Sequence, residues 1–453
     1  MRSIWAVAAN TVKQTLRMKL PATFIILLAI LLPVMGFITT GDGTMKGRLQ
    51  TFVSYGLSLT SLLLCLLTII ISTYTITNDL KQKHLYTILT KPIRRWQFIL
   101  GKFFGIIILD AILLFIFSAI IYSITIYTPR FLDADPNTIA QLKNEFYTAR
   151  ASLTPPQVDV SKEVDEHYNR LHNTGQLPPG MSRNEILTQL TNQKKLAKRA
   201  SGPGQQLLWE FENVKPIGTD QYLFIRFKYD VSVNPPDLQA YGRFDVGDIR
   251  QIKFGNIETP IYRFDRKDVI RTFHEIQVPA DAIAKDGYLA IRFLNVPLND
   301  TVIIFPIEDG LEVLYKAGTF TANFIKAILL IFLRLIFLIA LGIFAASFLS
   351  FPVAIMLSLV IFFIGTVSGF TLESFESLGE EMGLVYDFTI KPFVLLLPQF
   401  DKVAPAKFMI PAKFLSWTLL AQVAATMVCL KALLLLIAGL IIFSCKEIAK
   451  VIV

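Results

Sequence analysis

The chain is poor in cysteine and in charged residues. Its 453 residues include three cysteines, Cys65, Cys429 and Cys445, and each lies in or beside a hydrophobic run. The polar middle of the chain therefore cannot contain a disulfide and must be stable through its own core. Only 17% of the residues are charged, below the roughly 25% of globular proteins, while 53% are apolar. This composition excludes disordered, collagen-like and coiled-coil chains and indicates an integral membrane protein with a large polar insert.

Motifs of catalysis and of nucleotide binding are also missing. The sequence contains no G-x-x-x-x-G-K-[ST], H-E-x-x-H, G-x-S-x-G or C-x-x-C pattern. His167 and His172 lie five residues apart with no cysteine nearby, which is a weak metal signal. We therefore expect no catalytic residue, no metal site and no cofactor bound by this chain. Any ATP hydrolysis would take place on a separate polypeptide.

Positive charge is in excess only beside the hydrophobic runs. Residues 127–319 hold 23 Lys+Arg and 25 Asp+Glu, a net charge of −2, whereas the rest of the chain holds 21 against 10, a net charge of +11. Lysine and arginine next to membrane spans orient the helices. The overall charge of +9 is explained in this way, and we expect no nucleic-acid partner.

Six apolar stretches approach or exceed the roughly 20 residues that a helix needs to cross a membrane. They lie at about 21–39, 52–77, 103–127, 322–349, 352–371 and 414–444. Before the first span, Ile4, Ala8, Val12 and Leu16 recur at roughly helical spacing beside Trp5. This pattern predicts an amphipathic helix at 1–20 on the cytoplasmic membrane surface. The alternative is a simple extension of the first span.

The distribution of lysine and arginine predicts the orientation of the spans. The first twenty residues carry four Lys/Arg and no acid, and residues 78–102 carry six Lys/Arg against Asp79 alone. Both segments are expected to be cytoplasmic. Counting spans then places both termini in the cytoplasm, and residues 128–319 and the loop 373–413 outside. We expect a multi-pass protein of the cell (inner) membrane, with spans one to three in 21–127 and spans four to six in 320–453.

The external insert changes its hydrophobic period near residue 205. Residues 137–200 are polar and interrupted by prolines, which predicts two or three helices. Residues 205–310 contain short alternating runs that predict an antiparallel β-sandwich. The stretch FHEIQVPADAIAKDGYLAIRFLNV, Phe273 to Val296, resembles the later strands of jelly-roll modules of the carbohydrate-binding kind. The fold class is thus a polytopic α-helical membrane protein with six transmembrane helices and an α+β extracytoplasmic domain. Expected strands are 207–211, 223–231, 249–254, 261–264, 274–278, 289–293 and 301–307.

The segment between spans two and three, NDLKQKHLYTILTKPIRRWQFILGKFFG, resembles the corresponding loop of ABC-2 type (type V) transporter permeases. In that family an acidic-led helix with a leucine-rich stripe precedes Lys-Pro, a basic and aromatic turn, and Gly-Lys at the next span. The stretch VLLLPQFDKVAPAKF, which begins at Val394, similarly resembles the family's Leu-Pro-aromatic-Asp segment before the last span. The stripe here is Leu85, Ile88 and Leu89, followed by Lys91-Pro92, Arg94-Arg95-Trp96 and Gly101-Lys102.

The resemblance implies a coupling helix within 78–96 that seats in a groove of an ABC ATPase. It also implies a second permease subunit, identical or paralogous, and two ATPase subunits that bind the ATP and Mg²⁺. The alternative is an ordinary cytoplasmic loop rich in positive charge, and we interpret His84 as a surface residue and not a ligand. The candidate coupling residues are Asp79, Lys81, His84, Leu85, Ile88, Leu89, Lys91, Pro92, Arg94 and Arg95.

Three charged residues, Asp110, Arg334 and Lys431, lie inside predicted spans. Each costs about 2.5–3.5 kcal/mol there unless it is paired or hydrated. We predict that Asp110 pairs with Arg334 or Lys431, or that the two basic residues line a path for an anionic headgroup. An ion pair that only fixes helix packing is the alternative. Lys326 lies near the outer edge and is expected to extend its amine to the membrane surface.

These features predict the permease subunit of an ABC exporter. The expected cargo is amphiphilic, such as a lipid, glycolipid, polyketide or peptide. The external domain would receive the cargo or an envelope partner. One alternative is an ABC-type complex that transmits force to envelope partners without translocation. Another is an ATP-independent, membrane-anchored binding protein.

Overall fold

The computed structural model describes residues 2–81, 94–156, 159–177, 183–214, 222–251, 258–307, 310–376, 392 and 397–445. The chain divides into two compact units. A helical unit combines Met1–Tyr147 with Phe320–Val453, and a sheet-rich unit comprises Thr148–Thr319.

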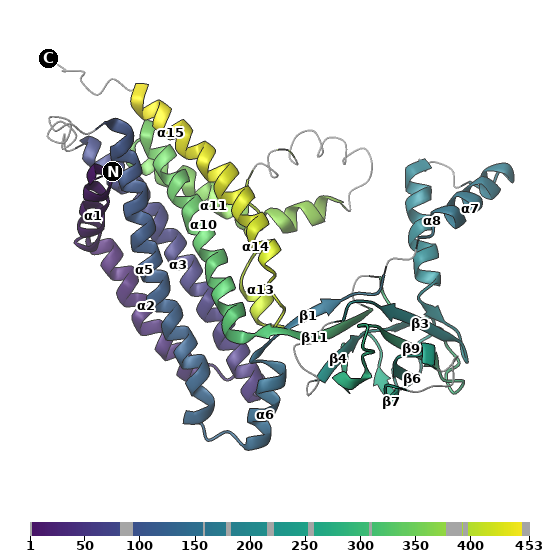
Figure 1. Cartoon of the computed structure of the whole chain (residues 1–453). Helices are drawn as coiled ribbons and strands as arrows, with labels where there is room; N and C mark the ends of the chain where they lie inside the picture. The colour runs from purple at the N-terminus through teal and green to yellow at the C-terminus, as the bar shows by residue number, and fades with distance from the viewer. Residues whose placement is uncertain are drawn as a thin grey trace, which may run out of the picture. The chain divides into compact units, whose positions relative to one another are not determined.

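The helical unit contains six helices that are long and apolar enough to cross a membrane, within the described residues (Figure 1). This confirms the predicted number of spans. Two of the helices, α3 and α5, are 37 residues each and extend well beyond the predicted apolar stretches. The helices that carry the spans are α2 (Lys19–Ile38), α3 (Met45–Lys81), α5 (Arg95–Phe131), α10 (Phe320–Phe348), α11 (Phe351–Glu376) and the continuous series α14 (Trp417–Val423), η2 (Ala424–Ala432) and α15 (Leu433–Cys445).

The spans differ in how much of their surface lies inside the unit. The most apolar windows of α3 and α10 are 67% and 61% buried, against 17% for α2 and 22% for the last span. The central helices α3 and α10 therefore form the core, and the other two present apolar surface to the membrane. Short helices complete the unit: α1 (Arg2–Leu16), α6 (Pro136–Glu145) and α13 (Ala406–Met409).

Helix α1 is separate from α2 and packs on α5 through two glycines. A Cβ on Gly101 would lie 2.6 Å from the Cβ of Val7, and one on Gly105 would lie 2.8 Å from the carbonyl of Ala8. Glycine at both positions therefore permits close approach of the two backbones. The buried residues of α1 are Ala8, Thr11 and Thr15, whereas Trp5 and Leu16 are exposed. Of the predicted stripe, Ala8 alone is fully buried.

The sheet-rich unit holds three antiparallel sheets with strand orders β1-β11-β4-β8, β2-β10-β5 and β3-β9-β6-β7. One apolar cluster includes residues of both four-stranded sheets, such as Ile225 and Val313 from the first and Phe244 and Phe293 from the second. The strands are β1 (Thr148–Leu153), β2 (Ala200–Ser201), β3 (Gln206–Phe211), β4 (Tyr222–Phe227), β5 (Asp230–Val231), β6 (Gln239–Gly247), β7 (Tyr262–Val269), β8 (His274–Pro279), β9 (Leu289–Asn295), β10 (Ile303–Ile304) and β11 (Leu311–Thr319).

Most helices and strands of this region lie where the sequence predicts them. Helices α6, α7 (Ser161–Asn173) and α8 (Arg183–Ala197) account for the expected helical part. Four strands, β1, β2, β6 and β11, are not among those predicted. The prediction of a strand at 249–254 is wrong for residues 249–251, which form a turn and a short helical stretch. The remainder of that predicted strand lies outside the described residues.

Candidate functional site

Four of the predicted coupling residues, Asp79, Lys81, Arg94 and Arg95, lie in the described part of the chain, where α3 ends and α5 begins. The other six, His84, Leu85, Ile88, Leu89, Lys91 and Pro92, lie outside the described residues. We call the described ends of α3 and α5, with the residues that they contact, the 82–93 junction.

A buried ion pair joins the two helices at the 82–93 junction. The Nζ of Lys102 on α5 lies 2.7 Å from Oδ2 of Asp79 on α3, and the two side chains are 2% and 7% exposed. The same Nζ donates to Oε1 of Gln14 on α1 at 3.2 Å and lies 5.5 Å from the centre of the Phe98 ring. Removing one member of a buried pair leaves an uncompensated charge. The pair therefore connects three helices next to the predicted coupling segment.

The start of α5 is held by two further contacts. Gln97 Oε1 accepts hydrogen bonds from the backbone N–H of Arg94 at 3.1 Å and from the Ser3 hydroxyl at 3.3 Å. The Arg95 guanidinium donates to the carbonyl of Ser444, near the end of α15, at 2.7 Å. Figure 1 shows α1 and the end of α15 at the same end of the helical unit. The first turn of α5 thus contacts elements near both ends of the chain, whereas Lys81 is exposed.

A cavity of about 520 Å³ lies beside the end of α3. It is lined on one side by Tyr74, Thr77 and Lys81, and on the other by residues 348–351 at the turn between α10 and α11. The cavity has both polar and apolar walls and is close in sequence to the coupling segment. The end of α3 and the α10–α11 turn thus border the same cavity.

The predicted pairing of Asp110 with Arg334 or Lys431 is wrong. Asp110 is buried and accepts a hydrogen bond at Oδ2 from the Thr68 hydroxyl at 2.8 Å, while its Oδ1 has no partner among the described residues. Arg334 donates to the Ser61 hydroxyl at 3.3 Å and to the carbonyl of Phe400 at 2.7 Å. The acid and the bases are thus engaged with different groups.

The basic residues of the spans instead hold the segment that precedes the last span. Lys431 Nζ donates to the carbonyl of Leu397, and Lys326 Nζ donates to that of Leu415, each at 2.8 Å. Arg334 also lies over the ring of Phe400, at 4.9 Å from its centre. Irregular backbone inside a membrane bundle requires partners for its carbonyls. We call residues 397–416, held by these three cations, the clamped segment.

The lysines of the clamp differ from simple interfacial lysines. Lys326 does not extend to the surface as expected, because its side chain is buried and its amine lies over the rings of Phe414 and Trp417. Lys431 lies within the π-helix η2, a wider turn that is frequent at functional sites.

The Leu-Pro-aromatic-Asp resemblance falls on this clamped segment. Its residues are Leu397, Pro398, Phe400 and Asp401. The carbonyls of Leu397 and Phe400 are the groups that Lys431 and Arg334 hold. The motif therefore coincides with the part of the segment that the cations fix.

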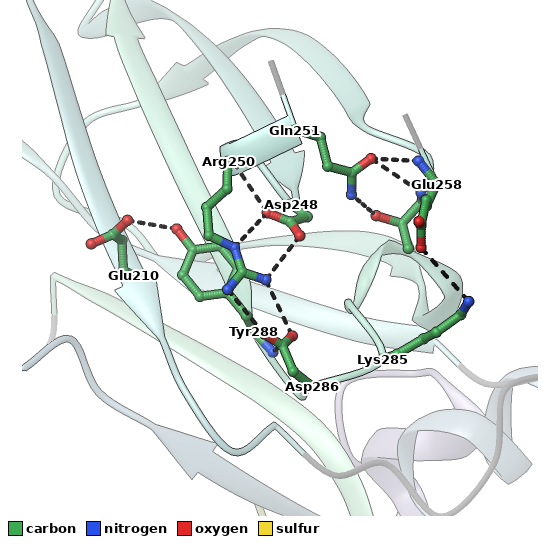
Figure 2. A network of polar contacts seen from close by, with 9 residues as sticks. Glu210, Asp248, Arg250, Gln251, Glu258, Lys285, Asp286 and Tyr288 are labelled. Carbon is green, nitrogen blue, oxygen red and sulfur yellow. Dashed lines mark hydrogen bonds and ion pairs between the residues drawn. The ribbon is translucent and has the colours of Figure 1, made fainter. Parts of the chain in front are cut away.

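A separate polar network lies in the sheet-rich unit (Figure 2). Arg250 donates to both carboxylate oxygens of Asp248 at 2.9 Å and to Asp286 at 2.9 and 3.2 Å, and it stacks on the Tyr288 ring at 3.8 Å. The Tyr288 hydroxyl donates to Glu210 at 2.5 Å. These hydrogen bonds from Arg250 hold the pKa of Asp248 and of Asp286 below the usual range. Because the charged groups satisfy one another, we interpret the network as a structural link between β3, the end of β6 and the start of β9.

The comparison with protein families finds a match in the N-terminal part of the chain. Residues 2–140 match the family described as ABC-2 family transporter protein. This part of the chain, about a third of its length, is thus similar to ABC-2 type permeases. The matched range covers α1, α2, α3, α5 and the 82–93 junction, including both members of the buried ion pair. No curated protein matches the chain.

The family and the six apolar helices together support a multi-pass membrane protein that is a permease component of an ABC transporter. ABC-2 permeases partner in general with an ABC ATPase, and the permease is itself a membrane component that is generally non-catalytic. Within the described residues, no group of three or more His, Cys, Asp or Glu side chains is arranged to hold a metal ion.

Gln14, Gln97 and the pairing of Lys102 are not predicted from the sequence. A signal for Lys102 exists, since a lysine next to an apolar run needs a partner and Asp79 is the one acid of residues 78–102. Lys102 stands just before the predicted third span, so it is not counted among the charges inside the membrane. Gln14 and Gln97 give no comparable signal, because exposed helices contain many glutamines.

Proposed function

We propose that this protein is the permease subunit of an ABC exporter for an amphiphilic substrate, such as a lipid, glycolipid or peptide. The ATP would be bound with Mg²⁺ and hydrolysed by separate ATPase subunits. The family match over residues 2–140 carries this proposal. That range contains the segment predicted to enter a groove of the ATPase.

The proposed orientation follows from the charge distribution. Residues 1–20 and 78–102 carry ten Lys/Arg and one acid, which favours the cytoplasmic side. Both termini would then be cytoplasmic, and residues 128–319 would lie outside the cell (inner) membrane. The common core of the two four-stranded sheets supports a sandwich arrangement for the external domain.

The proposed mechanism begins at residues 82–93. Movement of an ATPase subunit would displace this segment, and the displacement would pass to α3 and α5. Because Lys102 bridges Asp79 on α3 and Gln14 on α1, the three helices would move together. With this buried ion pair in place, a displacement of residues 82–93 would move the helices as a rigid group. It would not merely bend one helix end.

The assembly we propose contains two permease subunits and two ATPases. A unit of six spans needs a second copy, identical or paralogous, to enclose a path across the membrane. The basic residues Arg334 and Lys431 donate to carbonyls of the clamped segment, so we assign them a positioning role in the bundle. An acid–base pair between Asp110 and these residues has no part in this mechanism.

One observation favours a second candidate function, the transmission of force to envelope partners without translocation. Strand β11 ends at Thr319 and α10 begins at Phe320, with no residue between them. β1 and β11 pair from Thr148 opposite Thr319, so both connections to the sheet-rich unit are tied by backbone hydrogen bonds. Movement of α10 would pass directly into strand β11 along the chain.

Co-purification with an ATPase tests the proposed function. We expect a stoichiometric ATP-binding subunit with the wild type and its loss, with loss of stimulated ATP hydrolysis, in L85A/L89A. T87A, on the opposite side of the predicted helix, is the matched control and should retain both. Absence of an ATPase from the wild type would favour an ATP-independent binding protein.

Flux in proteoliposomes separates the two ATP-driven candidates. Export predicts ATP-dependent movement of an amphiphile across the bilayer. Force transmission predicts ATP hydrolysis without flux, and its effect on envelope partners should disappear when a flexible Gly-Ser insert separates Thr319 from Phe320.

A further inference from the structure

A second cavity, of about 340 Å³, lies where α2 ends, α3 begins and α5 ends. Most of its lining is apolar, including Pro33, Gly36, Ile124 and Phe131. Arg48 is the single charged residue among the described residues that line it. Figure 1 shows the ends of α2 and α5 at the end of the helical unit away from α1. This cavity is therefore remote from the 82–93 junction.

The guanidinium of Arg48 is only partly satisfied. Its Nη2 donates to the carbonyls of Phe37 at 2.9 Å and Gly36 at 3.3 Å, which are among the last carbonyls of α2. Its Nε is buried and has no hydrogen-bond partner among the described residues. A buried N–H of a charged group without a partner is costly. The site therefore lacks an acceptor, and an anionic oxygen is the strongest one.

Two described acids, Asp42 and Glu145, contact residues other than Arg48. Asp42 accepts from the backbone N–H of Thr44 at 3.0 Å and from its hydroxyl at 2.6 Å. Glu145 forms an ion pair with Lys46 at 2.5 Å. Neither carboxylate forms an ion pair with Arg48 in the described part of the chain. Within the described part of the chain no acceptor contacts the Arg48 Nε, which leaves it available to an acceptor from another molecule.

The mouth of the cavity has the surface of a membrane interface. Phe37 and Phe131 are 82% and 83% exposed, although both are large apolar side chains. Such residues at helix ends contact lipid, not water. The Thr128 hydroxyl, the other polar side chain of the described lining, donates to the carbonyl of Ile124 at 2.6 Å. The cavity thus offers one cation beside an apolar groove that opens to lipid.

We propose that this cavity binds one anionic phospholipid, with its phosphate on Arg48 and part of an acyl chain against Pro33, Ile124 and Phe131. One cation matches one phosphate, and the groove is too apolar for a sugar or a charged peptide. The lipid would join the ends of α2, α3 and α5 at the membrane surface. Binding of this lipid requires neither the ATPase nor a particular direction of transport.

Native mass spectrometry of the detergent-purified full chain tests this site. The probes are phosphatidylglycerol and phosphatidylcholine with the same acyl chains, and glycerol 3-phosphate without chains. We expect one phosphatidylglycerol to bind per subunit, at least about fivefold more tightly than phosphatidylcholine. This is the gain in affinity that one basic residue provides next to an anionic headgroup. R48Q should abolish this preference, while R130Q should retain it, since Arg130 stacks on Tyr127 and does not line the cavity.

A second variant guards against local unfolding in R48Q, where α2 would lose two hydrogen bonds. T128F keeps Arg48 but fills the groove, and we expect it to weaken phosphatidylglycerol binding by a similar factor. Equal binding of the two lipids, or unchanged phosphatidylglycerol binding in both R48Q and T128F, would overturn the proposal. Glycerol 3-phosphate that binds as tightly as the lipid would also overturn it, because the site would then serve a free phosphate.

Discussion

Two buried acids of the helical unit have different surroundings. Asp79 has a cation at 2.7 Å, whereas Asp110 is hydrogen-bonded to the Thr68 hydroxyl. A buried carboxylate next to an ammonium is stabilised by that charge, and one without a cation is not. Breaking the ion pair of Asp79 should therefore lower the stability of the protein, whereas neutralising Asp110 should not.

Lys102→Met should destabilise the protein strongly. It leaves Asp79 buried without a counter-charge, which costs about 3–5 kcal/mol for a broken buried pair. Adding D79N should recover much of that loss. Unfolding of the detergent-solubilised chain by denaturant measures both, with the exposed Lys81→Met as the matched control. Equal stability of K102M and K81M would contradict the importance of the pair.

Asp110→Asn should leave the protein at least as stable as the wild type. The amide oxygen of asparagine can accept the same hydrogen bond from Thr68, and no cation loses a partner among the described residues. The thermal midpoint in detergent checks this expectation, and assembly with the ATPase should also be intact. A large loss of stability would show that a positive charge does act on Asp110.

At the scale of single residues, the sequence predicts which charges matter but not their partners. Asp110, Arg334 and Lys431 are recognisable because charges inside apolar runs need compensation. The sequence does not show that a carbonyl of residues 397–416 can provide it, because that requires knowing where the segment lies. In β4, Leu223, Ile225 and Phe227 lie on one buried face, as alternation in a strand implies, although Phe224 on the opposite face is buried as well.

At the scale of elements, the clamped segment is the most unusual feature. Apart from the short helix α13, its backbone leaves regular helical hydrogen bonding, and side chains of α10 and η2 take up its carbonyls. The Asn323 side chain adds a reciprocal pair, donating to the carbonyl of Lys413 at 2.9 Å and accepting from the N–H of Leu415 at 2.8 Å. The position of the segment thus depends on polar groups inside the bundle.

Arg334→Met should release the clamped segment without unfolding the spans. The Phe400 carbonyl would lose its charged donor, a hydrogen bond worth about 1.5–3 kcal/mol. Amide hydrogen exchange of peptides from 397–416 should rise, while exchange in α3 should stay low. Lys407→Met, an exposed change within the same segment, is the control and should leave exchange unaltered. No increase in R334M would argue against the clamp.

Elements are predictable from the sequence where the pattern is strong and local. The six spans stand out because a run of about 20 apolar residues is rarely anything but a transmembrane helix. β1 and β11 are not evident, although every residue of β1 pairs with β11, because the paired residues are at least 160 positions apart in sequence. β1 also lies in a polar stretch between two helices, and β6 carries Gly242 and charged residues that weaken its alternation.

At the scale of the whole molecule, the sheet-rich unit should be sensitive to acid. Arg250 lowers the pKa of Asp248 and Asp286 in the folded state. Their contribution to stability is therefore present above the unfolded pKa of about 3.9 and is lost as the pH falls through the lower folded values. At pH values below about 4, the urea concentration at the unfolding midpoint of this unit should therefore decrease.

A full-length variant that keeps Trp209 as its sole tryptophan can report this unfolding, since Trp209 is buried against Phe305 in the sheet-rich unit. R250Q should lower the midpoint at neutral pH and remove much of its dependence on pH below about 4. A wild-type midpoint that does not change on acidification, or an R250Q that keeps the full dependence, would contradict the role of the network.

The proposed mechanism depends on residues 82–93 contacting an ATPase on the side of the chain termini. A photo-reactive amino acid at position 85 tests this contact directly in intact cells, with the same group at the exposed position 162 of α7 as the control. We predict a crosslink from position 85 to an ATP-binding subunit and none from position 162. A crosslink to such a subunit from position 162, or none from position 85 while position 85 reacts with an impermeant reagent added outside the cell, would contradict the mechanism.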